Sequence, residues 1–304
     1  MATVIVFDEY GEPDVLHPIE VPDPEPGPGQ VRIRVRAAGV QPFDCGTRRG
    51  DFADYFPLEF PARLGNEVAG IVDQAGSGVT SVAEGDEVIA FLRMQGYADT
   101  VVVPADQVAK RPASMPWGEA GVLSASGQTA QTALDELAVA PGDTVLIHAA
   151  AGGVGSFAVQ IARERGAAVI GTASEHNHDY LRSLGAIPVT YGPGLADRVR
   201  SVAPDGVDAV LDAIGGEALD VSVELVGSTE RIVTIADWAN AARLGVRRVG
   251  TERSVGKLAE LTRMYGEGHL KVSIWKAFPL ARTADAHREV ETGHVRGKVV
   301  LTVD

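Results

Sequence analysis

Apolar and polar residues alternate in the first third of the chain as they do in half-buried β-strands. Residues 31–36 (VRIRVR) place an apolar side chain at every second position, which is the period of a strand with one buried face. Short apolar runs follow at residues 68–72, 87–92 and 98–103, separated by Gly, Ser and Asp turns at a spacing of about ten residues. The pattern predicts a compact β domain with partial-barrel character.

From Pro112 onward, strands and helices alternate. Apolar runs predict strands at residues 144–149, 168–173, 207–212, 231–235 and 298–303, and helical periodicity predicts helices at 154–165, 177–184 and 217–226. Such alternation implies right-handed crossovers onto a parallel sheet with helices on both faces. We expect the last strand to return to the first domain. The predicted fold class is α/β, with a doubly wound parallel sheet and a second, β-rich domain.

Composition indicates a soluble globular protein with two domains. The chain has 304 residues, 45% of them hydrophobic and 22% charged, and one core at this length would be near its upper size limit. The formal charge of −14 disfavours nucleic-acid or membrane-surface binding, because such a field repels phosphates. Arg243, Arg247, Arg248 and Arg253 form the one basic cluster, and a solvated face explains them.

Cysteine content and the N-terminus indicate a reducing compartment. Cys45 is the only cysteine, so neither an intrachain disulfide nor a multi-cysteine metal site can form. Residues 1–8 lack the basic start and apolar stretch of a signal peptide. The long uncharged window at residues 144–162 contains a glycine-rich turn, which is not typical of a membrane span. We expect a cytoplasmic protein.

Residues 145–156 (VLIHAAAGGVGS) are the most informative stretch. A buried strand runs into Ala150, Gly152, Gly153, Val154 and Gly155, and a helix follows. Small residues permit a tight turn, close approach of the backbone to a pyrophosphate and packing of helix on strand, while the helix N-terminus attracts phosphate. Ala150 replaces the first glycine of the fingerprint, and an ordinary tight turn is the alternative. The βαβ context predicts a dinucleotide site.

The end of the next strand indicates which dinucleotide binds. NAD sites usually carry a carboxylate there for the ribose 2′-hydroxyl, and that charge would repel the 2′-phosphate of NADP. Ser174 stands at this position and can donate to the phosphate, with Asn177, His178 and Tyr191 as further donors. Glu175 is the contrary signal, because a shift of one residue would place it on the ribose. The sequence favours NADPH.

Six segments, in order, resemble the medium-chain dehydrogenase/reductases, in particular their zinc-free, quinone-oxidoreductase-like branch. They are 39–44 (GVQPFD), 65–67 (GNE), 124–129 (SASGQT), the glycine-rich loop, 211–216 (LDAIGG) and 296–298 (RGK). The resemblance implies a GroES-like catalytic domain at residues 1–118, a Rossmann NADP-binding domain at 119–264 and a return segment at 265–304 that completes the catalytic domain. It also implies an active site in the cleft between the domains, and a homodimer.

The same resemblance implies hydride transfer from NADPH to a small-molecule quinone or α,β-unsaturated carbonyl. A pathway-specific enoyl reductase remains open within this chemistry. So does a non-catalytic NADPH-binding protein, comparable to the crystallins of this family or to redox-sensing subunits. Turnover, as opposed to simple binding, separates the last possibility from the first two.

The positions of zinc ligands in related enzymes can be compared directly. Zinc-dependent relatives carry a cysteine where this chain has Gln41 and a histidine where it has Asn66, so only Glu67 remains of the expected ligands. The four-cysteine lobe of structural zinc is also missing from the sequence. We therefore expect no metal. Rate enhancement must then come from positioning the nicotinamide and from hydrogen bonds to the developing oxyanion.

The resemblance carries roles over to individual residues. Gln41, Asp44 and Thr129 would lie near the nicotinamide. The cofactor would also meet backbone groups of Ile235 and Ala236 at its carboxamide, Ile214 nearby, and Arg296, Gly297 and Lys298 at its pyrophosphate.

Two departures from the family pattern stand out. The branch favours asparagine where Gln41 stands, and some members have an aromatic residue where this chain has Gly46, which suggests a wider pocket. Tyr55, in a Phe-rich loop, is the candidate catalytic phenol, whereas Tyr97 is expected to pack. Asp44 either takes part in the reaction or is a buried carboxylate that joins strand to loop through backbone hydrogen bonds. Solvent can supply the proton, so no general acid is assigned.

Overall fold

The computed structural model describes residues 1–303 and divides the chain into two compact units. The first unit comprises Met1–Ala125, Arg253–Glu267 and the chain from Val272 onward, and the second comprises Ser126–Glu252 and Gly268–Lys271. The sequence predicted the boundaries between the two domains at residues 118 and 264. Helix α9 (Val255–Gly266) groups with the first unit because it packs against β8 (Val108–Lys110). Asp304, the last residue of the predicted return segment, lies outside the described residues.

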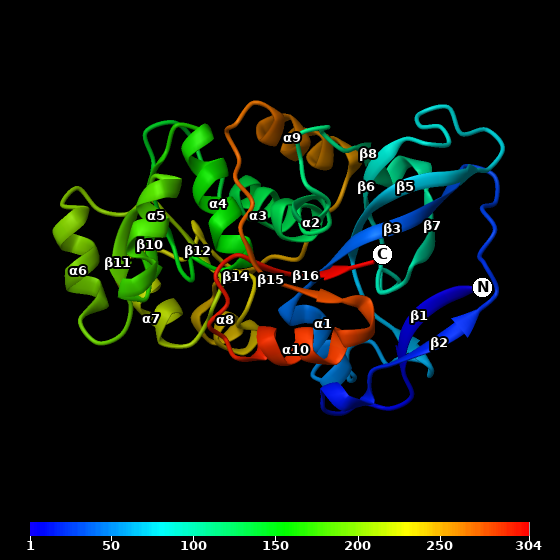
Figure 1. The fold of residues 1–304 in the computed structure, drawn as a ribbon. Coiled ribbons are helices and arrows are strands. Elements are labelled where there is room, and N and C mark those ends of the chain that lie inside the picture. The colour runs from blue at the N-terminus through cyan, green and yellow to red at the C-terminus, as the bar shows by residue number, and fades with distance from the viewer. Residues whose placement is uncertain (304) are drawn as a thin grey trace. The chain divides into compact units, whose positions relative to one another are not determined.

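A seven-stranded sheet forms the body of the first unit (Figure 1). Its strands run in the order β15, β16, β3, β5, β6 and β8, with β7 also paired to β3. Their bounds are β15 Ile274–Pro279, β16 Lys298–Thr302, β3 Gln30–Val40, β5 Glu67–Ala75, β6 Glu87–Phe91 and β7 Thr100–Pro104. The predicted strands of this region are all present. The last strand returns to the first unit as expected, because β16 pairs antiparallel with β3.

A second, three-stranded sheet of the first unit was not predicted. Its order is β2 (His17–Val21), β1 (Ala2–Phe7) and β4 (Ala62–Arg63). The sequence of β1, ATVIVF, is buried along almost its whole length, so it lacks the alternation of a half-buried strand. Hydrophobic residues of β1 join those of the large sheet in one core.

Local sequence signals define helix α1 (Pro42–Arg49), which follows β3 directly. Gln41 is its N-cap and forms a capping box with Asp44, and Pro42 occupies the first turn. Gly50 ends the helix in a left-handed conformation with φ of 94°. The other helical segments of this unit are η1 Pro13–Val15, η2 Ala105–Gln107, α2 Trp117–Ala120, η4 Leu280–Arg282 and α10 Thr283–Glu291.

The second unit is built on a six-stranded sheet whose strands are all parallel (Figure 1). Its order is β11 (Ile187–Thr190), β10 (Ala168–Ala173), β9 (Thr144–Ile147), β12 (Ala209–Asp212), β13 (Ile232–Thr234) and β14 (Arg247–Arg248). The chain leaves β9 toward β10 on one side and later returns to β12 on the other. This reversal is the topological switch point at which such sheets bind ligands.

Helices connect these strands, and three of them, α4, α5 and α7, lie where the sequence pattern predicted helices. The helical segments are α3 Ser124–Glu136, α4 Gly153–Glu164, η3 Glu175–Asn177, α5 His178–Leu184, α6 Leu195–Val202, α7 Glu217–Val226 and α8 Trp238–Leu244. Buried aliphatic residues of the strands, among them Leu146, Ile170 and Val210, form the core. The predicted α/β class with a parallel sheet and a second, β-rich body is confirmed. Among the described residues, no helix combines the length and apolar character needed to cross a membrane.

Candidate functional site

The loop between β9 and α4 has the close backbone packing that a dinucleotide site requires. Ala149 takes a left-handed conformation with φ of 52°, and Gly152 is the N-cap of α4. A Cβ atom on Gly155 would lie 2.3 Å from the carbonyl oxygen of Ala149 and 2.7 Å from the Cα atom of Ala150. Any side chain at residue 155 would therefore push the helix away from the loop.

Helix α4 presents its N-terminus at the switch point of the sheet. Its first turn contains Gly153, Val154 and Gly155, whose N–H groups precede the first internal hydrogen bond of an α-helix. These groups and the helix dipole favour a negatively charged ligand. The loop therefore fits the pyrophosphate of a dinucleotide, as the sequence predicted.

Ser174 directly follows β10, at the end of the strand where the sequence predicted contact with the ribose. Ser174 is the N-cap of η3, and its Oγ lies 3.3 Å from His176 Nε2 and 3.3 Å from Asn177 Nδ2. His178 Nε2 lies 3.4 Å from Thr190 Oγ1, and Tyr191 is 59% exposed. The group that could meet a 2′-phosphate is thus made of hydroxyl, amide and imidazole side chains.

Asp212 organises the turns that follow β12 and β13. Its carboxylate is fully buried and accepts hydrogen bonds from Ile214 N at 3.1 Å, Gly215 N at 2.8 Å and the Thr234 hydroxyl at 2.6 Å. Ile235 N donates to the Asp212 carbonyl at 3.0 Å and Ala236 N to the Thr234 hydroxyl at 3.1 Å. The backbone N–H groups of Ile235 and Ala236 already donate hydrogen bonds within the unit. Only the backbone carbonyl groups of these residues would therefore be available to a carboxamide. The Ile214 side chain is 63% exposed.

His148, at the end of β9, is a buried structural histidine. Its ring nitrogens lie 3.1 Å from the Thr172 hydroxyl and 3.0 Å from the Ser222 hydroxyl. Burial lowers the pKa of His148 to about 4, because the charged form would lose its hydration. The imidazole is therefore neutral near pH 7.

In the first unit, Gln41, Glu67 and Lys298 form a buried polar network. The Gln41 amide donates from Nε2 to Glu67 Oε1 and accepts at Oε1 from Lys298 Nζ. Lys298 Nζ also lies 3.4 Å from Glu67 Oε1, and the two side chains are 3% and 0% exposed. Burial lowers the pKa of Lys298, and the Glu67 carboxylate opposes this shift. The network holds the Gln41 side chain in one orientation.

Strand register creates the polar network. Val299 pairs with Val40 and Ala38 pairs with Val68, so the ends of β16, β3 and β5 meet. A Cβ atom on Gly39 would lie 2.1 Å from Glu67 Oε1, so the glycine makes room for the carboxylate. Glu67 Oε2 accepts a further hydrogen bond of 2.6 Å from Ala125 N, in the first turn of α3.

Asp44 ties α1 to the neighbouring strand and loop. It is fully buried and accepts hydrogen bonds from Gln41 N at 2.9 Å, Asn66 Nδ2 at 2.8 Å and the Tyr97 hydroxyl at 3.0 Å. Burial raises the pKa of Asp44 to about 6, and the hydrogen bonds to its charged form oppose this shift. This arrangement agrees with the second of the two roles considered for Asp44, that of a buried carboxylate that joins strand to loop.

Tyr97 and His287 complete the surroundings of Asp44. The Tyr97 hydroxyl lies 3.2 Å from His287 Nε2, and both side chains are buried. Burial lowers the pKa of His287 to about 3 and raises that of Tyr97 well above its usual value. Sequence reasoning missed His287, which is 190 positions from Tyr97. No sequence pattern predicts a contact between two residues this far apart in the chain.

The donor set around Gln41 does not fit zinc. Asn66 uses its amide on Asp44, and the side-chain oxygens of Gln41 and Glu67 face the Lys298 ammonium. A metal at these oxygens would meet a positive charge already in place. Within residues 1–303, His, Cys, Asp and Glu side chains form no group of three or more that could hold a metal ion.

The remaining predicted catalytic residues lie in different surroundings. Thr129, on α3, has its Oγ1 2.6 Å from Thr251 Oγ1. Tyr55 lies in the loop after α1 and is 70% exposed. The wider space expected beside Gly46 is already filled, since a Cβ atom there would lie 3.0 Å from the ring of Phe52. The expectation of a wider pocket from Gly46 alone was therefore wrong.

The segment before β16 is shaped by Gly297, which has φ of 72°. A Cβ atom there would lie 2.3 Å from the Ser273 carbonyl oxygen, and Lys298 N donates to that oxygen at 2.9 Å. Arg296 is half-buried. The Lys298 side chain is buried and its ammonium contacts Gln41 and Glu67 in the polar network, and its contact with a pyrophosphate stays a prediction.

The predicted site residues thus fall into two groups, one in each unit. The first unit contains Gln41, Asp44, Tyr55, Arg296, Gly297 and Lys298. The second unit contains Thr129, Ala150, Gly152, Gly153, Val154, Gly155, Ser174, Asn177, His178, Tyr191, Ile214, Ile235 and Ala236. In the first group, the structure brings Gln41, Asp44 and Lys298 together.

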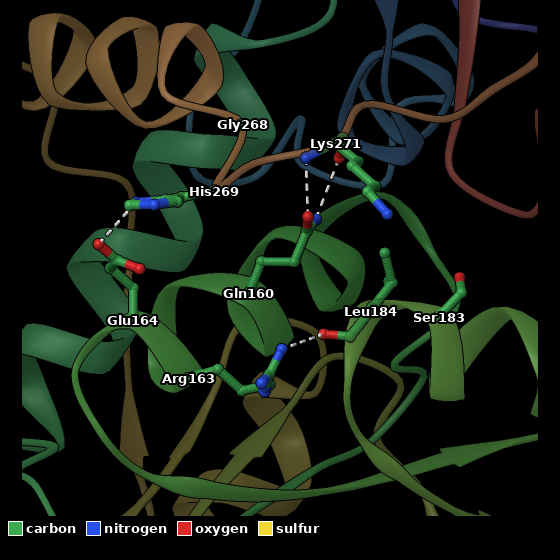
Figure 2. A pocket seen from close by; sticks show the side chains of 8 residues that line it. All are labelled: Gln160, Arg163, Glu164, Ser183, Leu184, Gly268, His269 and Lys271. Atoms are coloured by element: carbon green, nitrogen blue, oxygen red, sulfur yellow. Dashed lines mark hydrogen bonds and ion pairs between the residues drawn. The ribbon is translucent and has the colours of Figure 1, made fainter.

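A polar cavity of about 330 Å³ lies at the opposite end of α4 (Figure 2). Gln160 accepts from Lys271 N at 2.7 Å and donates to the Lys271 carbonyl at 3.0 Å, so it fastens the segment 268–271 to the helix. Arg163 donates to the Leu184 carbonyl at 3.2 Å. Because α4 and α5 both end here, Arg163 and Lys271 complement two negative helix ends. We assign this cavity a structural role.

Comparisons with known proteins identify the family. Residues 27–116 match the alcohol dehydrogenase GroES-like domain and residues 184–301 match the zinc-binding dehydrogenase domain. A quinone oxidoreductase structure from Coxiella burnetii shares 33% identity with a TM-score of 0.89, covering 100% of this chain and 99% of that one. The chain belongs to the medium-chain dehydrogenase/reductase superfamily, in its zinc-free branch.

Three further similarities bear on cofactor and reaction. The Escherichia coli quinone oxidoreductase complexed with NADPH is 25% identical, with a TM-score of 0.87 and coverage of 99% of this chain and 100% of that one. The CurK enoyl reductase is 28% identical, with a TM-score of 0.89 and coverage of 100% and 99%. The polyketide synthase GfsB of Streptomyces halstedii is 37% identical over 258 residues, 80% of this chain. The chain spans only 5% of that synthase and 7% of the synthase component PikAII.

Proposed function

We propose that the protein is an NADPH-dependent reductase that transfers hydride to a quinone or an α,β-unsaturated carbonyl without zinc. The observation that carries the proposal is the polar network of Gln41, Glu67 and Lys298. In a chain with a dinucleotide loop, this network places an ammonium at the oxygens a catalytic metal would need. Hydride transfer is then supported by fixed protein dipoles and charges.

Ser174 supports NADPH as the reductant. The position that carries a carboxylate in NAD sites holds a hydroxyl, with Asn177 and His176 beside it. The similarity to a quinone oxidoreductase complexed with NADPH agrees with this choice. Glu175 is exposed on the following turn and becomes the ribose-binding acid if NADH proves to be preferred.

The reduction of the acceptor requires one hydride and one proton. Bound NADPH supplies the hydride from its nicotinamide, and this chain supplies orientation and charge. The α4 N-terminus would hold the phosphates, and Gly155 keeps the loop packed against the helix. Gln41 is held by Glu67 and Lys298 in one orientation, which suits a polar group that positions a reactant. Solvent delivers the proton to the reduced oxygen or carbon.

The first test measures the oxidation of NADPH by a panel of quinones and enones. The second uses NADPH deuterated stereospecifically at C4 and measures the transfer of deuterium to the product. We expect turnover, transfer of deuterium from one C4 form to an enone carbon, and no effect of chelators. Acceptor reduction that transferred no deuterium from either C4 form, or activity lost on removal of bound zinc, would contradict the proposal. Binding of NADPH without turnover of any acceptor would favour a non-catalytic protein.

A pathway-specific enoyl reductase is the second candidate. The similarities to the CurK enoyl reductase and to polyketide synthases favour it. It uses the same hydride chemistry, so substrate preference is the distinguishing measurement. A kcat/KM for an enoyl thioester above that for every quinone tested would select it.

A further inference from the structure

The loop that follows β11 in the second unit is held by a single arginine of α6. Arg198 Nε donates to the Thr190 carbonyl at 2.9 Å, and its Nη1 donates to the Pro193 carbonyl at 2.8 Å. Its Nη2 donates to the Tyr191 carbonyl at 3.3 Å and to the Gly192 carbonyl at 3.0 Å. One guanidinium therefore binds the carbonyl groups of four consecutive residues. We call these four residues the clamped loop.

The Arg198 guanidinium places a positive charge on the clamped loop. All four of these acceptors are neutral carbonyl oxygens, and in the part of the chain that the structure describes Arg198 forms no ion pair with a carboxylate. Arg200, two positions further along α6, instead pairs with Asp197 at 3.4 Å and with Glu224 at 2.5 Å. In a chain with a formal charge of −14, a cation without a carboxylate partner favours the approach of an anionic group.

Strand register places the clamped loop beside Ser174. β10 and β11 are parallel, and Ala173 pairs with Thr190. Ser174 and Tyr191 each follow one of these paired residues, so the chain leaves the two strands at neighbouring points on the same end of the sheet. The carboxyl ends of parallel strands are where such sheets bind ligands. Tyr191 is 59% exposed, so its side chain is accessible to a ligand at this end.

A second contact connects the clamped loop to the segment that follows Ser174. His178, the first residue of α5, has its Nε2 atom 3.4 Å from Thr190 Oγ1. The Ser174 hydroxyl itself lies 3.3 Å from Asn177 Nδ2, next to His178 in the chain. The hydroxyl of Ser174 and the phenol of Tyr191 therefore belong to two segments that contact each other.

Arg198 binds a part of the loop that the turn's own hydrogen bonds do not include. In the turn that leads into α6 (Figure 1), Leu195 N donates to the Gly192 carbonyl at 3.1 Å and Arg198 N donates to the Gly194 carbonyl at 3.2 Å. The carbonyls of Thr190 and Tyr191 precede this turn, at the end of the outermost strand of the sheet. The Arg198 side chain donates to both of them, so it can fix the position of Tyr191.

We propose that Arg198 is a positioning residue for the adenosine 2′-phosphate of NADPH and acts by holding Tyr191 beside Ser174. This inference rests on the proposed function, because it takes NADPH as the cofactor. The hydroxyl groups of Tyr191 and Ser174 can both donate to one phosphate, which has several acceptor oxygens. A loop that is fixed before binding loses less conformational entropy when the ligand binds. The clamped loop therefore favours a ligand that carries the 2′-phosphate.

The first experiment uses fragments of the cofactor and requires no turnover. Adenosine 2′,5′-bisphosphate and adenosine 5′-monophosphate differ only in the 2′-phosphate, and calorimetry measures the Kd of each. Arg198→Lys keeps the positive charge but lacks the planar set of donors that binds four carbonyls. We expect the Kd of the bisphosphate to rise about 3- to 10-fold, the range for ordering one side chain on binding, and that of the monophosphate to rise less than about 2-fold.

Arg200→Lys is the matched control for this experiment. Arg200 lies on the same helix, its side chain is 51% exposed, and it bonds carboxylates instead of the clamped loop. Both Kd values should equal those of the wild type. Circular dichroism establishes that each variant is folded.

The second experiment tests whether Arg198 acts through Tyr191. Tyr191→Phe removes the hydroxyl group and keeps the ring, and we expect it to weaken binding of the bisphosphate. In the Tyr191→Phe background, Arg198→Lys should raise the Kd of the bisphosphate by less than about 2-fold, because no hydroxyl group is left to position. The full loss of about 3- to 10-fold in both backgrounds would mean that the two residues act independently, and it would overturn the inference.

The outcomes separate this inference from the proposed function. If the wild type binds the bisphosphate no better than the monophosphate, NADPH is not the preferred cofactor, and the proposed function and the inference both fail. If the bisphosphate is preferred but Arg198→Lys binds it like the wild type, the proposed function stands and the inference is wrong. Equal losses for both adenosine phosphates would show general damage to the loop and would also refute the positioning role. A loss confined to the bisphosphate and absent in the Tyr191→Phe background supports it.

Discussion

Removal of the Lys298 ammonium tests whether the polar network is the buried ion pair that the structure describes. Lys298 and Glu67 are 3% and 0% exposed, and Lys298 Nζ lies 3.4 Å from Glu67 Oε1. Lys298→Met removes the charge and retains a flexible apolar chain. Glu67 then keeps hydrogen bonds from Gln41 Nε2 and Ala125 N and the electrostatic influence of Arg253, but it loses the ammonium beside its Oε1 atom. A buried carboxylate without its partner ammonium is the expected source of instability.

The magnitude follows from the distance and the burial. With an effective dielectric near 20, unit charges 3.4 Å apart attract by about 5 kcal/mol. Loss of one partner of a buried pair typically costs about 3–5 kcal/mol, and we expect Lys298→Met to lower the free energy of unfolding by that amount. Lys298→Met/Glu67→Gln removes both charges. The double variant should be more stable than the sum of the single effects predicts, by about 2 kcal/mol or more.

Urea denaturation at pH 7 measures these differences, and the tryptophans allow the first unit to be observed separately. Trp117 and Trp275 belong to the first unit and Trp238 to the second, and the chain has three tryptophans. In a Trp238→Phe background, fluorescence therefore reports the first unit. Lys276→Met is the matched control, because Lys276 is 51% exposed and pairs with Glu289 at 2.8 Å. An exposed pair is worth about 1 kcal/mol or less.

Two results would refute the reasoning about the ion pair. One is a Lys298→Met variant no less stable than Lys276→Met. The other is simple additivity of Lys298→Met and Glu67→Gln in the double variant, which would mean that the two groups do not interact. Neither result depends on the cofactor or the substrate, so the test addresses the structure alone.

Three further predictions concern the second unit. Ser174→Asp should lower kcat/KM with NADPH about 10- to 150-fold through repulsion of the 2′-phosphate, and leave NADH unchanged or improved; equal losses for both cofactors would show general damage to the loop. Gly155→Ala should abolish NADPH binding measured by calorimetry, because its Cβ atom would lie 2.3 Å from a backbone oxygen, whereas Gly250→Ala, with open space around it, should bind normally. Burial lowers the pKa of His148 from 6.5 to about 4, so its stabilising contribution is present above pH 6.5 and is lost as the pH falls toward 4. This contribution of His148 to the free energy of unfolding is about 3 kcal/mol. His148→Gln should flatten this part of the curve of unfolding free energy against pH, and an unchanged slope would contradict the assignment.

Local patterns predicted the second unit well. The strands predicted at 144–149, 168–173 and 207–212 and the helices predicted at 154–165, 177–184 and 217–226 are present, because they follow period and turn signals that operate within a few residues; β11 and α6 were not predicted. The glycine-rich loop was also predictable, because Gly155 contacts Ala149 and Ala150, which are only a few positions away. Features of the site that are formed by one strand, the turn after it and the next helix can therefore be predicted from the sequence.

The polar network could not be predicted in this way. Lys298 meets Gln41 because β16 pairs with β3 in a particular register, and a shift of one residue would turn each side chain to the other face. The sequence placed Lys298 on a cofactor pyrophosphate by resemblance, whereas the structure places its ammonium on Gln41 and Glu67. His287 reaches Tyr97 by a similarly long path.

Neither of the two departures from the family pattern leaves an open space. Gly46 lacks the aromatic ring found in some relatives, yet the Phe52 ring from the following turn occupies that volume. Gln41 replaces asparagine, and its longer side chain spans from Glu67 to Lys298, so its donor and its acceptor both have partners. In each case a residue elsewhere in the chain supplies what the substituted position lacks. A difference from a family motif therefore indicates a change in the site only after the neighbours that fill its space are known.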